Sequence, residues 1–233
     1  MSMYPLILIA DDDPVVHESL GLYLSSEGYE HQSVYDGQQA IEMFESLHPD
    51  LIVLDLMMPK MSGLDVCRQI RQNSSVPIIM LTAKGEDMDK ILGLEYGADD
   101  YMTKPFNILE VKARIKSIFR RSQSVQEAPE ESRVIRVRDL EVNYQNRTVT
   151  RGTKLIRLTA KEFDLLQLLI THRGKVYNRE ELLASVWKYD YMGEMRTVDV
   201  HIRRLREKVE HDNNKPEFIL TKWGVGYYFT DED

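Results

Sequence analysis

Short apolar runs alternate with amphipathic segments along residues 6–119, and this alternation most restricts how the chain can fold. Three of the runs are nearly all apolar, as expected for strands covered on both faces of a sheet. Between them, apolar residues recur at helical spacing, as Ile41, Phe44 and Leu47 do. The alternation predicts an α/β doubly wound, flavodoxin-like fold with a five-stranded parallel sheet. The predicted strands are residues 6–10, 31–34, 51–54, 77–81 and 100–103, and the predicted helices include residues 40–47 and 108–119.

The pattern changes after a polar segment without apolar periodicity, residues 122–132, which predicts a flexible linker. Four short strand-like stretches, three helical segments and two strand-like runs around glycines follow in that order. This order predicts an α+β winged helix-turn-helix domain over residues 133–233, after a first domain over residues 1–121.

Two of the predicted helices in the second domain begin at capping-box sequences. Thr159 and Glu162 stand at the spacing at which each side chain satisfies the backbone N–H of the other. Asn178 and Glu181 repeat that spacing at the next helix. The first helix is therefore expected to begin after Thr159 and the second after Asn178.

The formal net charge of −8 belongs to the first domain, where 19 acidic side chains face 11 basic ones, while the rest of the chain has 19 of each. Such asymmetry favours two domains with different partners. The single cysteine, Cys67, excludes an internal disulfide and suits a reducing compartment. No apolar run approaches the roughly 18 residues of a membrane span, and the N-terminus lacks a cationic signal sequence. These features predict a cytoplasmic protein.

Carboxylates gather where the first and third predicted strands end. Asp11, Asp12 and Asp13 follow the first strand, and Asp55 follows the third. Neighbouring parallel strands end about 5 Å apart at one edge of the sheet, so these groups would repel one another and raise each other's pKa. A divalent cation relieves that repulsion, and oxygen ligands with open positions suit Mg²⁺.

A hydroxyl and an ammonium group follow the fourth and fifth predicted strands, at Thr82 and Lys104. A metal and a lysine can neutralise phosphoryl oxygens while a carboxylate attacks in line, so this edge predicts a phosphoryl site. Each residue alone has a simpler interpretation, such as a helix cap for Asp55 or a surface side chain for Lys104. Their occurrence at four strand ends favours the site.

Four motifs resemble the receiver domain of bacterial two-component response regulators over residues 5–121. They are ADDD (10–13), DLMMPKMSG (55–63), LTA (81–83) and YMTKPF (101–106). The resemblance implies that a sensor histidine kinase transfers a phosphoryl group from its phosphohistidine to Asp55.

The same resemblance implies roles for the surrounding residues. Mg²⁺ would be held by Asp12, Asp55 and the backbone carbonyl of Met57, with Asp11 acting through water. Lys104, before a cis Pro105, would pair with the phosphoryl group, Thr82 would bond to it, and Tyr101 would then turn inward. Adding such a charged group can shift a bistable face of the domain.

The resemblance further implies a two-fold receiver dimer with ion pairs between the two copies. The matching positions pair Lys90 with Glu110 and Asp100 with Arg114. Because exposed ion pairs contribute little free energy, they would set register and partner choice more than affinity.

Residues 196–210, RTVDVHIRRLREKVE, predict a basic amphipathic helix. Val198, Ile202, Leu205 and Val209 recur at helical spacing, and the basic side chains lie mostly elsewhere. Such a helix can be a solvated surface helix, or it can enter the major groove, where arginine reads guanine and other cations neutralise phosphates.

Residues 133–230 resemble the winged-helix effectors of the OmpR/PhoB class, through LTAKEFDLL, REELLASVW, RTVDVHIRRLREK and GVGYYF. The residues implied to contact mainly phosphates are Arg196, Thr197, His201, Arg203 and Arg206. Those implied to lie nearest base edges are Asp199, Val200 and Arg204. The loop over residues 187–195 would face RNA polymerase. Many members carry a basic residue immediately before the first wing glycine, where this chain has Trp223, leaving Lys222 as the candidate for a DNA contact by the wing.

Together these features predict a transcription regulator controlled by phosphorylation. Phosphorylation of Asp55 would promote receiver dimerisation and binding of double-stranded DNA at tandem half-sites. A phosphatase or phosphotransferase would instead need an acid-base carboxylate near the nucleophile, and Met57 stands where one large family has it. No enzyme activity is therefore expected beyond slow self-dephosphorylation.

A third alternative is a DNA-binding protein whose receiver serves only for dimerisation. It would not require the complete set of residues Asp11, Asp12, Asp55, Thr82 and Lys104. DNA affinity that did not respond to phosphorylation would favour it.

Overall fold

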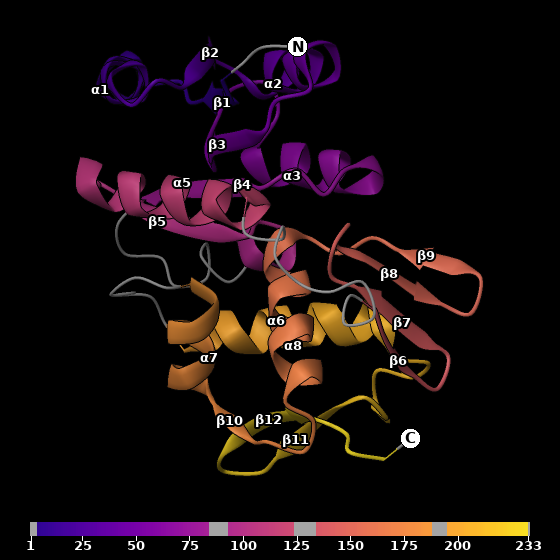
Figure 1. The fold of residues 1–233 in the computed structure, drawn as a ribbon. Coiled ribbons are helices and arrows are strands. Elements are labelled where there is room, and N and C mark those ends of the chain that lie inside the picture. Colours follow the sequence, from indigo (N-terminus) through magenta and orange to yellow (C-terminus); the bar gives the residue numbers. More distant parts are fainter. Residues whose placement is uncertain (1–3, 84–92, 124–133, 188–194, 233) are drawn as a thin grey trace. The chain divides into compact units, whose positions relative to one another are not determined.

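The computed structural model describes residues 4–83, 93–123, 134–187 and 195–232. The chain divides into two compact units, Met1–Lys112 and Ala113–Asp233 (Figure 1). The division falls within helix α5 (Ile108–Gln123), and most of the predicted linker lies outside the described residues. Within the described part of the chain, no helix is both long and apolar enough to cross a membrane.

The first unit is built on a five-stranded, all-parallel sheet in the order β2-β1-β3-β4-β5. Its strands are β1 (Leu6–Ala10), β2 (Glu30–Val34), β3 (Leu51–Asp55), β4 (Ile78–Ala83) and β5 (Asp100–Lys104). The predicted α/β fold is confirmed, and each strand end lies within two residues of its predicted position. The strand order reverses between β1 and β3, which is where open α/β sheets bind ligands.

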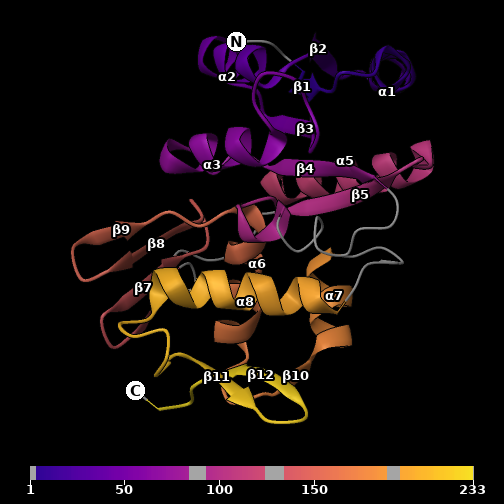
Figure 2. The same ribbon diagram turned by 180° about the vertical axis from the view of Figure 1, so that it is seen from behind.

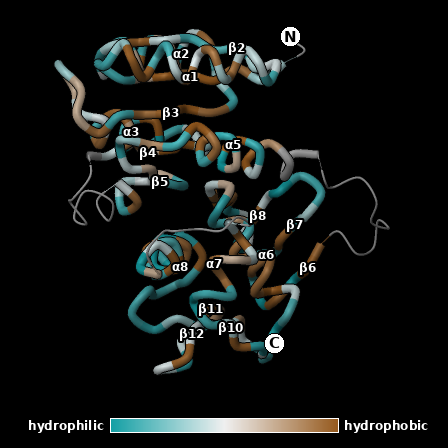
Figure 3. Tube along the Cα trace, turned by 90° about the vertical axis from the view of Figure 1, so that its left-hand side faces the viewer, coloured by the Kyte–Doolittle hydropathy of each residue, from teal (hydrophilic) through white to brown (hydrophobic). Residues whose placement is uncertain are grey.

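The apolar runs form the core of this sheet. Every residue of β3 is buried, including its last, Asp55, and the strand is coloured as hydrophobic in Figure 3. The edge strand β2 is largely exposed or half-buried and is correspondingly polar. A carboxylate at the end of β3 therefore lies at the boundary between an apolar core and the loops.

Three helices of this unit begin at polar caps directly after strand ends or short loops. They are α1 (Pro14–Ser26), α2 (Gly37–Leu47) and α3 (Gly63–Asn73), capped by Asp13, Asp36 and Ser62. Each cap accepts a hydrogen bond from a backbone N–H in the first turn of its helix. Figures 1 and 2 show α1 on one face of the sheet and α2 and α3 on the other.

The second unit contains a four-stranded antiparallel sheet in the order β6-β7-β8-β9. Its strands are β6 (Val134–Val137), β7 (Leu140–Asn143), β8 (Thr148–Arg151) and β9 (Lys154–Ile156). They match the four predicted strand-like stretches. Val137, Leu140, Val142 and Val149 belong to the same core as the helices that follow.

The three predicted helices of this unit are α6 (Ala160–Thr171), α7 (Arg179–Trp187) and α8 (Arg196–Val209). Both predicted capping boxes are confirmed. Thr159 and Glu162 bond reciprocally at α6, and Asn178 and Glu181 do so at α7. The apolar stripe of α8 is buried as its periodicity predicted.

The C-terminal hairpin pairs with a third strand that was not predicted. β10 (Tyr177–Asn178) pairs with β12 (Gly226–Phe229), which also pairs with β11 (Ile219–Lys222). At the hairpin tip, the Val225 N–H donates to the Lys222 carbonyl over 2.9 Å, and Gly224 adopts a left-handed conformation with φ of 73°. Trp223 at this tip is 89% exposed, whereas Trp187 is fully buried. The structure thus has the sheet, helices and wing of a winged helix-turn-helix domain.

Candidate functional site

The carboxyl ends of β1 and β3 bring three carboxylates together. The strand register pairs Ala10 with Leu54, so Asp11 and Asp55 follow side by side. Oxygen atoms of Asp11, Asp12 and Asp55 all lie within 4.8 Å of one another. Asp11 and Asp55 are buried and Asp12 is exposed, so the predicted cluster is present and one side of it is open to solvent.

Lys104, the last residue of β5, reaches this cluster. Its Nζ lies 2.7 Å from Asp11 Oδ2 and 2.8 Å from Asp55 Oδ1. Burial raises the pKa of Asp55, opposed by the hydrogen bond from Lys104, and the Asp11 charge adds to the rise. Burial alone would lower the pKa of Lys104, but its bonds to Asp11 and Asp55 outweigh that effect, and its pKa is raised. The lysine therefore stays charged and offsets the repulsion between the carboxylates.

The backbone fixes how the Asp55 carboxylate is presented. Oδ1 contacts Lys104, and Oδ2 accepts a hydrogen bond of 3.0 Å from the Met57 N–H. Gly63, at the start of α3, packs so closely that an added Cβ would lie 2.0 Å from the Asp55 carbonyl oxygen. A residue with any side chain at position 63 would thus displace the loop that carries Asp55.

The donor set of this cluster fits Mg²⁺. It consists of carboxylate oxygens within contact range of a single ion, with the exposed Asp12 leaving room for water. The Met57 carbonyl lies in the loop after β3, two residues beyond Asp55. A hard divalent cation with several water ligands suits such a site better than a softer metal.

The predicted switch residues lie on neighbouring strands, Thr82 near the carboxyl end of β4 and Tyr101 near the start of β5. Thr82 is fully buried, and its hydroxyl donates to the Met102 carbonyl over a long 3.5 Å. Tyr101 is 6% exposed. The peptide bond between Lys104 and Pro105 is cis, as the resemblance implied.

Two side-chain contacts near this edge of the sheet were not predicted from the sequence. The Nε2 of His17, on α1, donates to the Asp11 carbonyl over 2.7 Å. Lys60 Nζ lies 2.6 Å from Asp36 Oδ2, linking the loop after β3 to the cap of α2, and this hydrogen bond lowers the pKa of Asp36. Lys60 and Asp36 are 24 residues apart in the sequence, so only the tertiary structure identifies their contact.

The residues predicted for a dimer interface have mixed exposure. Asp100 and Arg114 are buried, and Glu110 is half-buried. Asp100 Oδ1 accepts a hydrogen bond from the Tyr101 N–H. Lys90 lies outside the described residues, and the intermolecular pairs stay a prediction.

The predicted DNA-contacting residues fall into three groups by exposure. Arg196, Arg203 and Lys222 are exposed, Asp199 and Arg206 are half-buried, and Thr197, Val200, His201 and Arg204 are buried. The predicted polymerase-facing loop lies outside the described residues except for its ends, Trp187 and Met195.

Several of these side chains already have partners inside the second unit. Asp199 Oδ1 accepts hydrogen bonds of 2.8 Å from Arg179 Nε and 2.7 Å from the Tyr227 hydroxyl. Burial and the bond to Asp199 raise the pKa of Tyr227 to about 12. This cluster joins α7, α8 and the wing strand β12, and sequence reasoning identified neither Arg179 nor Tyr227.

Two further residues, Arg206 and His201, attach α8 to its surroundings. Arg206 donates through Nε to the Ile219 carbonyl over 2.9 Å and through Nη2 to Thr221 Oγ1 over 2.8 Å. The His201 ring packs edge-on against the Trp187 ring, with centroids 5.1 Å apart. The helix is thereby fixed to the wing at one end and to the core of the unit along its length.

Comparisons with known proteins agree with both units. Residues 7–116 match the family described as response regulator receiver domain, and residues 152–229 match transcriptional regulatory protein, C terminal. A mutant form of RitR is 32% identical over 98% of this chain and 100% of its own, with a TM-score of 0.76. The response regulator DrrB, a Thermotoga maritima OmpR/PhoB homologue, is 33% identical over the same shares, with a TM-score of 0.52.

A parallel-sheet receiver with an acidic edge, followed by a winged helix, defines a response regulator that acts on transcription. The chain belongs to the OmpR/PhoB class of response regulators. A kinase and DNA are the partners that these two domains imply, and neither domain is a conventional enzyme.

Proposed function

We propose that a sensor histidine kinase phosphorylates Asp55 and that this promotes receiver dimerisation and sequence-specific binding of DNA. The observation that carries the proposal is the Lys104 ammonium, which lies within 2.8 Å of both Asp11 and Asp55 at the open edge of the sheet. A carboxylate that lies between a fixed cation and other carboxylates able to hold a metal ion is a suitable acceptor for a phosphoryl group.

In the proposed transfer, an Asp55 oxygen forms the new P–O bond as the P–N bond to the kinase histidine breaks. The histidine leaves as the neutral imidazole once it takes a proton. Asp12, Asp55 and the Met57 carbonyl would hold Mg²⁺, with Asp11 acting through water, and the ion would neutralise charge on the phosphoryl oxygens. Lys104 would exchange its carboxylate contacts for a phosphoryl oxygen.

Thr82 and Tyr101 would report the phosphoryl group to the rest of the receiver. The long 3.5 Å bond from Thr82 to the Met102 carbonyl is weak, so its hydroxyl can be drawn to a phosphoryl oxygen at small cost. The pairs Lys90–Glu110 and Asp100–Arg114 would then set the register of the dimer. Slow self-dephosphorylation would return Asp55 to its free form.

The second unit would place α8 in the major groove. The exposed Arg196 and Arg203 support this part of the proposal, because cations on an exposed helix face are what phosphates attract. Lys222 at the wing would lie near the backbone of an adjacent groove. Two bound copies would cover tandem half-sites, and the segment over residues 187–195 would face RNA polymerase.

The test is to treat the full chain with a small-molecule phosphodonor and Mg²⁺ and to measure intact mass, oligomeric state and binding to DNA. The expected result is one added phosphoryl group, a dimer and tighter DNA binding, all absent from Asp55→Ala. Phosphorylation that persisted in Asp55→Ala, or DNA affinity unchanged by phosphorylation, would refute the proposal.

A further inference from the structure

Trp223, at the tip of the wing, presents a large apolar side chain to solvent. The wing is the hairpin of β11 and β12, and the indole at its tip is 89% exposed, although tryptophan is highly buried on average. Val225, two residues further on, is 49% exposed. An indole in water has an unfavourable hydration that a partner would relieve. The tip of the wing therefore has the character of a contact surface.

The backbone of the turn holds this side chain in place. The Val225 N–H donates to the Lys222 carbonyl over 2.9 Å, and Gly224 has a φ of 73°, a left-handed conformation that glycine adopts without strain. Lys222 is paired with Gly226 in the strand register, so both strands continue up to the turn. Trp223 is thus part of a short, hydrogen-bonded turn.

Side chains at the end of α8 fix the base of the wing. Arg206 Nε donates to the Ile219 carbonyl over 2.9 Å. The Glu210 carboxylate, directly after α8, accepts a hydrogen bond of 2.8 Å from the Ile219 N–H. It also accepts hydrogen bonds from the N–H groups of Glu217 and Phe218. Because α8 bonds both backbone groups of Ile219, a duplex that lies along α8 would meet the wing at a set distance.

The charge of the wing restricts the choice of partner. Residues 219–229 contain one cation, the exposed Lys222, and no acidic side chain. A cation beside an exposed indole suits a polyanion that also has apolar surface. Double-stranded DNA has both, because phosphates border its minor groove and the deoxyribose sugars present C–H groups inside it. Proteins that bind the minor groove often place apolar side chains there.

We infer that Trp223 packs against deoxyribose sugars in the minor groove next to the major groove proposed for α8, while Lys222 pairs with a neighbouring phosphate. The inference rests on the proposed DNA-binding function and deepens it. A basic residue at position 223 would bind through a charge that salt screens, whereas the indole contact is apolar. The wing of this chain therefore holds DNA through a contact that responds little to ionic strength.

The test uses the full chain, treated with a small-molecule phosphodonor and Mg²⁺, and a duplex that the wild type selects from a randomised pool. Affinity is measured against salt concentration for the wild type, Trp223→Ala and Lys222→Ala, on the full site and on a single half-site. Leu155→Ala is the control, because Leu155 is 56% exposed on β9, in a different sheet of the same unit.

Trp223→Ala should weaken binding about tenfold and leave the dependence of affinity on salt unchanged. Lys222→Ala should reduce that dependence by about one charge. Leu155→Ala should bind as the wild type does. A loss below about twofold in Trp223→Ala, an equal loss in Leu155→Ala, or a changed salt dependence in Trp223→Ala would overturn the inference.

Hydroxyl-radical footprinting locates the contact, because these radicals attack the deoxyribose sugars from the minor groove. The wild type should protect sugars that Trp223→Ala leaves open to attack. A loss of affinity on the full site with none on the single half-site would show that the tip contacts the neighbouring copy, and would also overturn the inference. A wild type that binds no duplex would refute the proposed function, whereas equal binding by the wild type and Trp223→Ala would refute this inference alone.

Discussion

Lys104→Met should destabilise the receiver, and Mg²⁺ should reverse most of that loss. In the wild type, one ammonium compensates the two buried carboxylates of Asp11 and Asp55. Methionine keeps the apolar stem but removes the charge. The variant therefore separates the electrostatic role of Lys104 from its packing.

The magnitude follows from the geometry. Without the lysine, two carboxylates have oxygens within 4.8 Å of each other. At an effective dielectric constant of about 20, unit charges at that distance repel by about 3.5 kcal/mol. Breaking a buried ion pair costs about 3–5 kcal/mol. Because the Lys104 side chain is 26% exposed, solvent screening reduces the expected loss to about 2–3 kcal/mol.

Hydrogen exchange measured by mass spectrometry on peptides covering β1 and β3 reports this stability within the receiver. Without Mg²⁺, Lys104→Met should lose protection, and Mg²⁺ at 100 times the dissociation constant of this variant should restore about 2.7 kcal/mol. At the same Mg²⁺ concentration, a protein that keeps Lys104 should gain less, because the ammonium competes with the ion for Asp11 and Asp55. Lys112→Met is the control, because Lys112 forms a partly exposed pair with Glu27 away from the acidic edge. Unchanged protection in Lys104→Met, or equal responses to Mg²⁺ in the two variants, would refute the reasoning.

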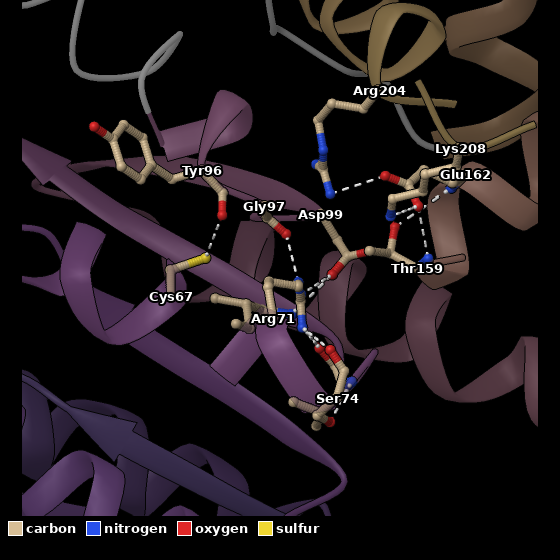
Figure 4. A network of polar contacts seen from close by, with 12 residues as sticks. Cys67, Arg71, Ser74, Tyr96, Gly97, Asp99, Thr159, Glu162, Arg204 and Lys208 are labelled. Carbon is tan, nitrogen blue, oxygen red and sulfur yellow. Dashed lines mark hydrogen bonds and ion pairs between the residues drawn. The ribbon is translucent and has the colours of Figure 1, made fainter. Parts of the chain in front are cut away.

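Three other substitutions test separate parts of the structure. Gly63→Ala places a Cβ 2.0 Å from the Asp55 carbonyl oxygen, so phosphorylation by a small phosphodonor should slow by about 100-fold; a wild-type rate in an intact-mass time course would contradict this. Tyr227→Phe removes a hydroxyl that holds the wing and should cost about 1 kcal/mol in urea unfolding. Because the pKa of Tyr227 is raised from 10 to about 12, its contribution is complete below pH 10 and is lost as the pH rises toward 12, so the variant should lack this alkaline loss of stability. Arg71→Met removes the guanidinium whose Nη2 lies 2.9 Å from Asp99 Oδ2, a contact drawn in Figure 4, and leaves Asp99 buried without it. The change should cost about 3–5 kcal/mol in thermal unfolding, whereas a loss below about 1 kcal/mol would show that the pair is not needed.

The acidic edge could be predicted from the sequence because parallel strands place their carboxyl ends together. Once residues 6–10 and 51–54 were identified as strands, Asp11 and Asp55 had to lie at one edge. The strand order that makes β1 and β3 neighbours is not a local property, and the pattern of apolar residues does not contain it. The winged-helix elements were likewise predictable from caps and periodicity.

What escaped prediction depends on which side chains meet after the helices pack. Periodicity placed Arg204 outside the apolar stripe of α8, but it could not show that the adjacent face meets Glu162. The capping box of Glu162 gave that residue a sufficient local explanation, which concealed its contacts with Arg204 and Lys208. β10 was missed because two residues are too few to show alternation.

The two tryptophans of the chain stand in opposite surroundings, with Trp187 fully buried and Trp223 almost fully exposed at the tip of the wing. Indole emission depends strongly on contact with water, so the two rings emit differently. Trp223 therefore responds to changes at the wing, whereas Trp187, whose ring centroid lies 5.1 Å from that of His201, responds to changes at α8. The protein therefore has an intrinsic fluorescent reporter at the point where its sequence departs from many members of its class, and binding by the wing can be followed without a label.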